Sequence, residues 1–233
     1  MRQSKTGAFD FAVVEGEFIK NKDLATLELE ASRRALALLK NRLGAARMLE
    51  LIREEVEETD RLWEGWAAES GDEWRVNLME FKVSGLPLSH WLKWVFENFT
   101  NESMHFAAHP EHYAWTQADR IYPDCGSSTP IVCEPMGEFM MRATARIEKW
   151  DGYEAYIDPD YPHHLTLMGY TINGIPISRS LSQFRETEDG FFFRLTAMKP
   201  AKIPPAMRER NQEHGFLEYA KYFKFAYDDY VGS

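Results

Sequence analysis

NQEHGFLEYAKY, residues Asn211–Tyr222, is predicted to be a helix close to the end of the chain. Proline suits a first helical turn and is excluded further in, so we expect this helix to begin after Pro204-Pro205 and to run to about Tyr230. His214 and Glu218 are four residues apart, which places them one turn above the other, within reach of a single metal ion. The stretch therefore predicts a terminal helix that carries two candidate metal ligands.

The helix has a second pattern, which bears on whether this pair is buried. An apolar stripe is formed by Phe216, Ala220, Phe223 and Tyr227. At 100° per residue His214 and Glu218 point away from it, and with Lys221 nearby they could form an ordinary exposed polar face. Tyr222 and Phe225, however, flank the same face. A helix with aromatic residues on both sides is expected to lie between a sheet and a second layer, where His214 and Glu218 would be enclosed.

The preceding part of the chain, from Glu102 to Pro200, consists of short β-like runs separated by turn residues. The predicted strands are Tyr113–Arg120, Pro130–Glu134, Glu138–Ile147, Leu165–Ile172, Ile175–Glu186 and Phe191–Met198. Asn173-Gly174 predicts a two-residue hairpin turn with positive φ at both positions, and Glu188-Asp189-Gly190 marks another turn. Antiparallel strands followed by one long helix predict an α+β domain in which a curved sheet wraps the terminal helix.

The first part of the chain has helical periodicity instead. Asn21–Ser70 is charged, rich in Leu and Ala and free of proline, with a break expected at Gly44. A half-buried strand, Trp74–Ser84, and a helix, His90–Phe99, follow. We therefore divide the chain into an N-terminal helical region, residues 1–72, and a main α+β domain, residues 73–233.

Composition excludes several classes of partner. The chain has 233 residues and a formal net charge of −10, with no basic block, so binding to nucleic acid is not expected. No apolar run approaches the roughly 20 residues of a membrane span, and we expect a soluble, cytoplasmic protein. Cys125 and Cys133 are expected to be buried or half-buried thiols. Aromatic residues make up 14% of the chain, which suits a flat apolar ligand as well as an ordinary core. Oligomeric state, including a homodimer, stays open.

Further metal ligands are sought among the remaining histidines and carboxylates. His105, His109 and His112 are clustered just before a predicted strand. Glu134 follows the apolar run Ile131–Cys133, where burying a charge is costly unless a cation pairs with it, so it is the preferred carboxylate.

Two other features compete for this role. Glu138 lies just beyond Glu134, and His163-His164 follows a turn-like segment that indicates a loop rim. Scattered structural histidines remain the alternative to a metal site. No Gly-rich phosphate loop, Gly-x-Ser-x-Gly elbow, His-Glu-x-x-His motif or Cys-x-x-Cys pair is present.

Four short patches, taken in order, resemble the diacetylphloroglucinol hydrolase and phloretin hydrolase family, whose members cleave a carbon–carbon bond between an aromatic polyol ring and an acyl group. The patches are His109–His112 (HPEH), Cys133–Gly137 (CEPMG), Gln183–Gly190 (QFRETEDG) and Glu213–Glu218 (EHGFLE). The resemblance implies a helix-grip (Bet v 1/START-like) fold, a phenolic ketone as substrate, and zinc, or another divalent metal such as Mn or Fe.

The resemblance also implies the ligands: His112, Glu134, His214 and Glu218. The first motif is one residue tighter than the family's, which leaves His109 as a substitute for His112. Characterised members carry a His and a Tyr that contact substrate where this chain has Ser182 and Ala197.

The chemistry expected of such a site is attack of activated water on an acyl carbonyl, with an electron-rich ring carbon as leaving group. Pocket residues that could assist are His105, His109, Tyr113 and Trp115. The rival interpretation is a non-enzymatic carrier or sensor, because a helix-grip cavity binds flat apolar molecules without a metal.

Overall fold

The computed structural model describes residues 23–122 and 129–232, so Cys125 lies outside the described residues. The chain divides into two units, residues 1–36 and 37–233. Helix α1 (Leu24–Leu51) is interrupted at Gly44, which has a φ of 69°, and α2 (Arg53–Ser70) follows. The break at Gly44 is confirmed, since only glycine adopts such a φ without strain.

The larger unit begins at Ala37 and not at the predicted residue 73. Trp63 of α2 belongs to this unit, since it is 1% exposed and packs with sheet residues such as Met141 and Ile177. Its indole N–H donates a hydrogen bond to the carbonyl of Met140 at 2.8 Å. Helix α2 is therefore part of the core of the α+β unit.

Seven antiparallel strands form one sheet in the described part of the chain, in the order β1-β7-β6-β5-β4-β3-β2. They are β1 (Trp74–Ser84), β2 (Ala114–Gln117), β3 (Pro130–Met136), β4 (Phe139–Arg146), β5 (His163–Tyr170), β6 (Pro176–Thr187) and β7 (Gly190–Pro200). Strands β2 to β7 form a meander, and β1 pairs with β7. Each predicted strand is present, although Ala118–Arg120 is a 3-10 helix, η1.

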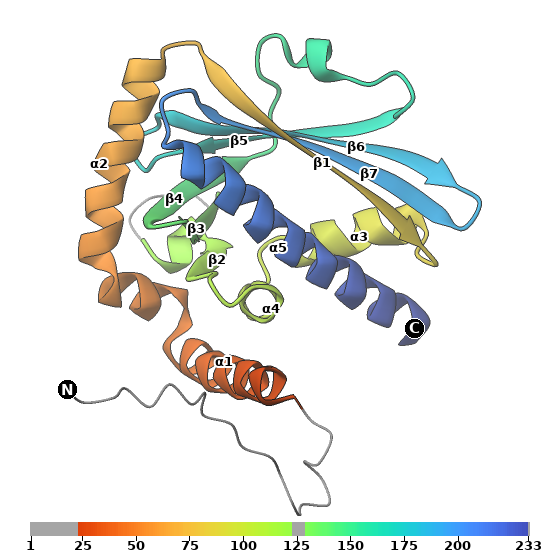
Figure 1. Ribbon diagram of the computed structural model, residues 1–233, viewed down its shortest axis with the longest axis horizontal. Helices are drawn as coiled ribbons and strands as arrows, with labels where there is room; N and C mark the ends of the chain where they lie inside the picture. Colours follow the sequence, from red (N-terminus) through yellow and green to blue (C-terminus); the bar gives the residue numbers. More distant parts are fainter. Residues whose placement is uncertain (1–22, 123–128, 233) are drawn as a thin grey trace, which may run out of the picture. The chain divides into compact units, whose positions relative to one another are not determined.

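Three more α-helices complete the unit: α3 (Leu88–Asn98), α4 (Glu102–Ala108) and α5 (Pro205–Gly232), with a short η3 (Tyr153–Tyr156). The sequence pattern did not reveal α4. Helix α5 runs along the sheet and contacts α3, α4, β1 and β3 (Figure 1). This is the helix-grip arrangement, and the predicted fold class is confirmed. Within the described ranges, no helix is long and apolar enough to cross a membrane.

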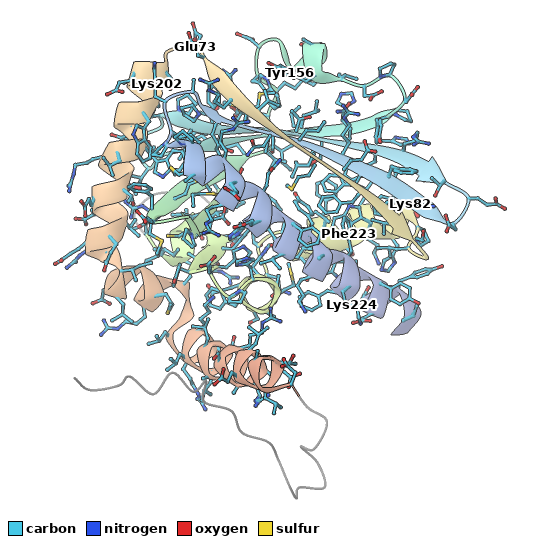
Figure 2. The ribbon with its side chains drawn as sticks, viewed as in Figure 1. Glu73, Lys82, Tyr156, Lys202, Phe223 and Lys224 are labelled. Atoms are coloured by element: carbon cyan, nitrogen blue, oxygen red, sulfur yellow. The ribbon has the colours of Figure 1, made fainter. Side chains whose placement is uncertain are left out.

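Aromatic side chains fill the space between α5, α3 and the sheet. Phe223 of α5 lies 4.8 Å from Trp91 of α3 and 5.6 Å from Phe81 of β1, measured between ring centroids. The next residue, Lys224, is exposed and forms an ion pair with Asp228 (Figure 2). Consecutive residues of α5, Phe223 and Lys224, thus face the core and the solvent, respectively.

The connection between β5 and β6 differs from the predicted two-residue turn. It spans residues 171–175, with hydrogen bonds from the Gly174 amide to the Thr171 carbonyl and from the Thr171 amide to the Ile175 carbonyl. Gly174 has a φ of 83°, but among the described residues no non-glycine has a positive φ. Asn173 therefore does not adopt the conformation that the two-residue turn requires. The turn at Glu188-Asp189 is confirmed.

Candidate metal centre

Helix α5 buries its polar face. His214, Glu218 and Tyr222, on successive turns, are 5%, 8% and 6% exposed. The apolar stripe predicted from the sequence is not the buried face of α5, because Phe216 is 58% exposed and Tyr227 is 41% exposed. Polar groups can be buried when other buried polar groups meet them, and β3 and the loop before β2 supply those groups here. The two candidate ligands on this helix are therefore enclosed.

The loop from His109 to Tyr113 supplies the second group of polar side chains. Helix α4 begins at Asn101, whose side chain accepts a hydrogen bond from the Met104 amide, and ends before Pro110, since the residue ahead of a proline disfavours helical geometry. The ammonium of Lys40, a fully buried residue, donates to the carbonyl of Pro110 and lies 3.5 Å from that of His109. These contacts hold the loop against Lys40 of α1.

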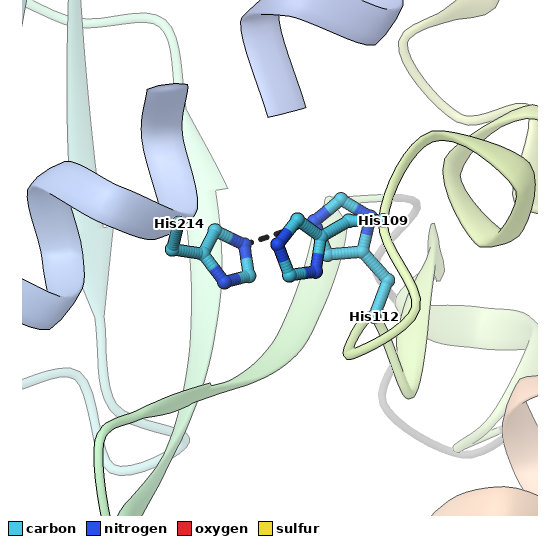
Figure 3. A group of neighbouring side chains, drawn as sticks. All are labelled: His109, His112 and His214. Atoms are coloured by element: carbon cyan, nitrogen blue, oxygen red, sulfur yellow. Dashed lines mark hydrogen bonds between the residues drawn. The ribbon is translucent and has the colours of Figure 1, made fainter. Parts of the chain in front are cut away.

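Three buried histidines meet at this point. His109 and His112 come from the loop and His214 comes from α5 (Figure 3). Ring nitrogens of the three lie within 4.8 Å of one another, close enough to hold a metal ion. The rings of His109 and His214 stack with their centroids 3.9 Å apart. Sequence analysis had given His109 to the pocket and His112 and His214 to the metal, and the structure brings all three together.

Hydrogen bonds distinguish the two loop histidines. His112 Nδ1 lies 2.8 Å from the carbonyl of His105, so Nδ1 carries the proton and Nε2 keeps a lone pair that faces His214. His109 Nδ1 instead accepts a hydrogen bond from the Glu111 amide at 3.1 Å. Its Nε2 therefore carries the proton in the neutral ring and has no lone pair for a metal. The pattern favours His112 over His109 as a ligand.

Glu134 and Glu218 complete the donor set. Glu134 Oε2 lies 3.5 Å from His112 Nε2 and 3.3 Å from His214 Nε2. His112 Nε2 lies 3.2 Å from His214 Nε2 and 3.6 Å from Glu218 Oε1. Ligand bonds of about 2.0 to 2.1 Å in tetrahedral zinc sites place donor atoms roughly 3.3 Å apart. Within the described residues Glu134 Oε2 accepts no well-aligned hydrogen bond. Donor atoms of His112, Glu134 and His214 are thus spaced as ligands of one ion, and Glu218 Oε1 lies beside His112.

The charges of the cluster also favour a cation. Burial lowers the pKa of His112 to about 3, although Glu134 opposes this. Burial also lowers the pKa of His214, but Glu134 and Glu218 outweigh it and raise the value to about 9. Burial and the neighbouring Glu134 raise the pKa of Glu218. The two carboxylates therefore draw a positive charge into a desolvated site, either a proton on His214 or a metal ion.

Tyr222 and His105 extend the cluster by two hydrogen bonds. The Tyr222 hydroxyl donates to Glu218 Oε1 at 2.7 Å and lies 2.6 Å from His105 Nδ1. The His105 ring stacks on Trp115, with centroids 4.0 Å apart. Burial, followed by the charge of Glu218, raises the pKa of Tyr222, while burial lowers that of His105 to about 4. Tyr222 thus stays protonated beside the carboxylate, with a neutral imidazole behind it.

The cluster opens into a cavity of about 250 Å³ between the sheet, α3 and α5. Its walls are mostly apolar, and they include Trp91, Trp94, Trp115, Phe184 and Phe193. Its polar lining includes His105, Glu134, Glu218 and Tyr222. A flat apolar molecule in this space would lie next to the proposed ligands.

The other sequence predictions have mixed outcomes. Trp115 lines the cavity and Ser182 does too, and Cys133 is buried as expected. Tyr113 and His109 are not among the described residues that line this cavity, so their roles as pocket residues stay predictions. The Tyr113 ring faces Lys40 at 5.5 Å and packs in a cluster with Ala45 and Cys133.

The competing ligand candidates lie elsewhere. Glu138 is exposed in the turn between β3 and β4, and His163 and His164 are exposed on β5. Two groups near the site were not foreseen. Glu111 Oε2 lies 4.0 Å from His214 Nδ1, too far for a hydrogen bond, and adds a negative charge beside the cluster. The second unforeseen group is Lys40, whose position in a charged helical segment of the sequence did not indicate that it would be buried.

No protein-family model and no curated protein matches this chain. Among solved structures, Ara h 8.0201 matches with a TM-score of 0.46 and 8% identity, covering 66% of this chain and 98% of that one. The di-domain ARO/CYC StfQ from the steffimycin biosynthetic pathway has a TM-score of 0.43 and 8% identity, covering 71% of this chain and 54% of that one. At these identities the likeness concerns the fold alone. The chain is a helix-grip protein with a candidate metal centre at one end of its cavity.

Proposed function

We propose that the protein is a metal-dependent hydrolase that cleaves the carbon–carbon bond between an acyl group and a phenolic ring. The observation that supports this most is the spacing of 3.2 to 3.5 Å among donor atoms of His112, Glu134 and His214, with Glu218 Oε1 3.6 Å from His112 Nε2, beside an apolar cavity. The order of the four sequence patches that resemble acylphloroglucinol-cleaving hydrolases gives the reaction its substrate class.

The donor set is two neutral imidazoles and two carboxylates. This set suits zinc, and manganese or iron also accept it. A divalent ion held there would supply Lewis acidity, which polarises a carbonyl and lowers the pKa of water.

The protein's own groups would bind the ring and handle protons. The tryptophan and phenylalanine walls of the cavity exclude water and hold a flat ring. Hydrolysis adds the oxygen of water to the acyl carbon, while the ring carbon keeps the bonding electrons and takes up a proton. The Tyr222 hydroxyl faces the cavity, with His105 Nδ1 2.6 Å behind it. This pair is placed to hold that proton near the breaking bond.

The test is metal content followed by turnover. Elemental analysis of the purified protein should find close to one divalent ion per chain, and acylated phenols should release a carboxylic acid. His214→Ala and Glu134→Ala should each abolish metal binding and keep the circular dichroism of a folded chain. Glu138→Ala, which removes an exposed carboxylate on the same hairpin, is the matched control and should bind metal normally. Full occupancy in both ligand variants would show that the ligands are wrongly assigned.

The second candidate function is non-enzymatic binding of a flat apolar or aromatic molecule. It is favoured by Ser182 and Ala197, which stand where characterised hydrolases of the resembled family carry groups that contact substrate. Ser182 lines the cavity. Purified protein that holds no stoichiometric metal but binds aromatic ligands would support this function and refute the hydrolase.

A further inference from the structure

The cavity has a second polar end, which the proposed chemistry does not use. Lys199 of β7 is 6% exposed and lines the cavity. Its ammonium donates to Ser178 Oγ at 3.0 Å and lies 3.3 Å from Met141 Sδ. An ammonium has three donors, and a thioether sulfur is a weak acceptor. Among the described residues, Ser178 is the only one whose oxygen accepts a hydrogen bond from Lys199. The ammonium of Lys199 can therefore donate a hydrogen bond to a further oxygen.

Small side chains create the space in front of Lys199. Ala145 of β4, Gly169 of β5 and Ser178 of β6 are neighbours across the sheet. A Cβ atom on Gly169 would lie 2.9 Å from that of Ser178, so only glycine fits there without displacement. Ser180 continues the row along β6 and also lines the cavity. The result is a hollow with hydroxyl groups and one ammonium in an otherwise apolar wall.

The charge balance of the cavity favours an anion at this end. A buried ammonium without a partner is costly. Glu134, at the metal centre, is the carboxylate whose charge acts on the Lys199 ammonium, and it opposes the effect of burial on the pKa of Lys199 only in part. A divalent ion at the centre would take up the charge of Glu134. The ammonium would then be the uncompensated charge of the cavity.

We propose that Lys199, with Ser178 and Ser180, binds a phenolate oxygen on the aromatic ring of the ligand. This inference rests on the proposed function for the orientation of the ligand, with the acyl group at the metal centre and the phenolic oxygen at Lys199. It makes Lys199 the residue that selects an acidic phenol over an ether of the same size.

A matched pair of ligands tests the proposal. 4′-Hydroxyacetophenone and 4′-methoxyacetophenone are titrated into the full-length protein by isothermal calorimetry, with and without a chelator. Wild type should prefer the hydroxy compound by roughly tenfold to a hundredfold, as expected for one hydrogen bond to a charged group. Lys199→Met should abolish this preference and leave binding of the methoxy compound in place. The control is Lys202→Met, which removes an exposed lysine and should keep the preference for the hydroxy compound.

The outcomes separate the proposal from the hydrolase assignment. A hydroxy preference that persists in Lys199→Met, or absence of binding of both compounds to wild type, would overturn the role of Lys199. A preference that depends on Lys199 but survives the chelator supports it even if no turnover is found. If Lys199→Met does not fold, Ser178→Ala provides the second test. It should weaken the preference severalfold, and an unchanged preference would count against the proposal.

Discussion

The buried Lys40 gives the protein a specific dependence of stability on pH. Its ammonium lies between two carbonyls of the His109–Pro110 segment and faces the rings of Phe106 at 5.2 Å and Tyr113 at 5.5 Å. Burial lowers its pKa from 10.5 to about 8, and the carboxylate of Glu111 opposes this only in part. Replacing Lys40 with methionine keeps a similar shape and removes the titrating group.

The sign and size of the effect follow from linkage. Between pH 8 and the ordinary pKa of lysine, the unfolded chain binds more protons than the folded one, so stability rises with pH. A shift of 10.5 to about 8 costs at most about 3 kcal/mol below pH 8. About 1 kcal/mol of this penalty is relieved between pH 7 and 9. Lys199, whose pKa burial also lowers to about 8 against the opposing charge of Glu134, contributes a similar amount.

The measurement is urea unfolding at pH 7 to 9 in the presence of a chelator. Between pH 7 and 9 the two lysines contribute a gain of about 2 kcal/mol, which His214 opposes because its pKa is raised to about 9 in the folded chain, so the change for Lys40→Met should be about 1 kcal/mol less favourable than for wild type. Lys93→Met, which removes an exposed lysine of α3, should gain as much as wild type. Above pH 9 Cys133 also lowers stability as the pH rises, because burial raises the pKa of its thiol to about 12. A Lys40→Met protein that gains as much as wild type would show that this ammonium is not desolvated.

Two further outcomes follow from the site and the core. His112→Ala should lose metal binding and His109→Ala should retain it, because of these two residues only His112 presents a lone pair to the cluster. The measurement is metal content after dialysis, and equal loss in both variants would refute the tautomer argument. Trp63→Ala should lower the free energy of unfolding by about 3 to 5 kcal/mol, because the Trp63 ring is buried in the sheet core. The measurement is urea unfolding, and a decrease below about 1 kcal/mol would show that α2 is a separate appendage.

The pattern of the sequence was sufficient for the strands and for the terminal helix. Alternation and turn residues located β1 and the β6–β7 hairpin, because these strands are long and their turns are short. Helix α4 was missed because Glu102–Ala108 is too short for helical periodicity to show. The connection between β5 and β6 was misjudged because Asn173-Gly174 also suits a longer loop.

The candidate site was predicted in part. The structure brings His112, Glu134 and His214 together with Glu218 beside His112, and their role as metal ligands stays a prediction. The apolar stripe of α5 pointed to the wrong buried face. Hydrophobicity alone could not indicate that polar side chains would be buried together, since their partners come from distant segments. Lys199 shares the inward face of β7 with Phe193 and Leu195, and this alternation was the signal that could have revealed it.

The hollow formed by Ala145, Gly169 and Ser178 makes the size of the binding space independent of the metal chemistry. These residues lie on β4, β5 and β6, whereas the proposed ligands lie on α5, β3 and the loop before β2. Enlarging one of the three side chains would shorten the ligand that fits and leave the four donor atoms in place. Variants in this row should therefore change the length of ligand that the cavity accepts and leave the candidate metal centre unchanged.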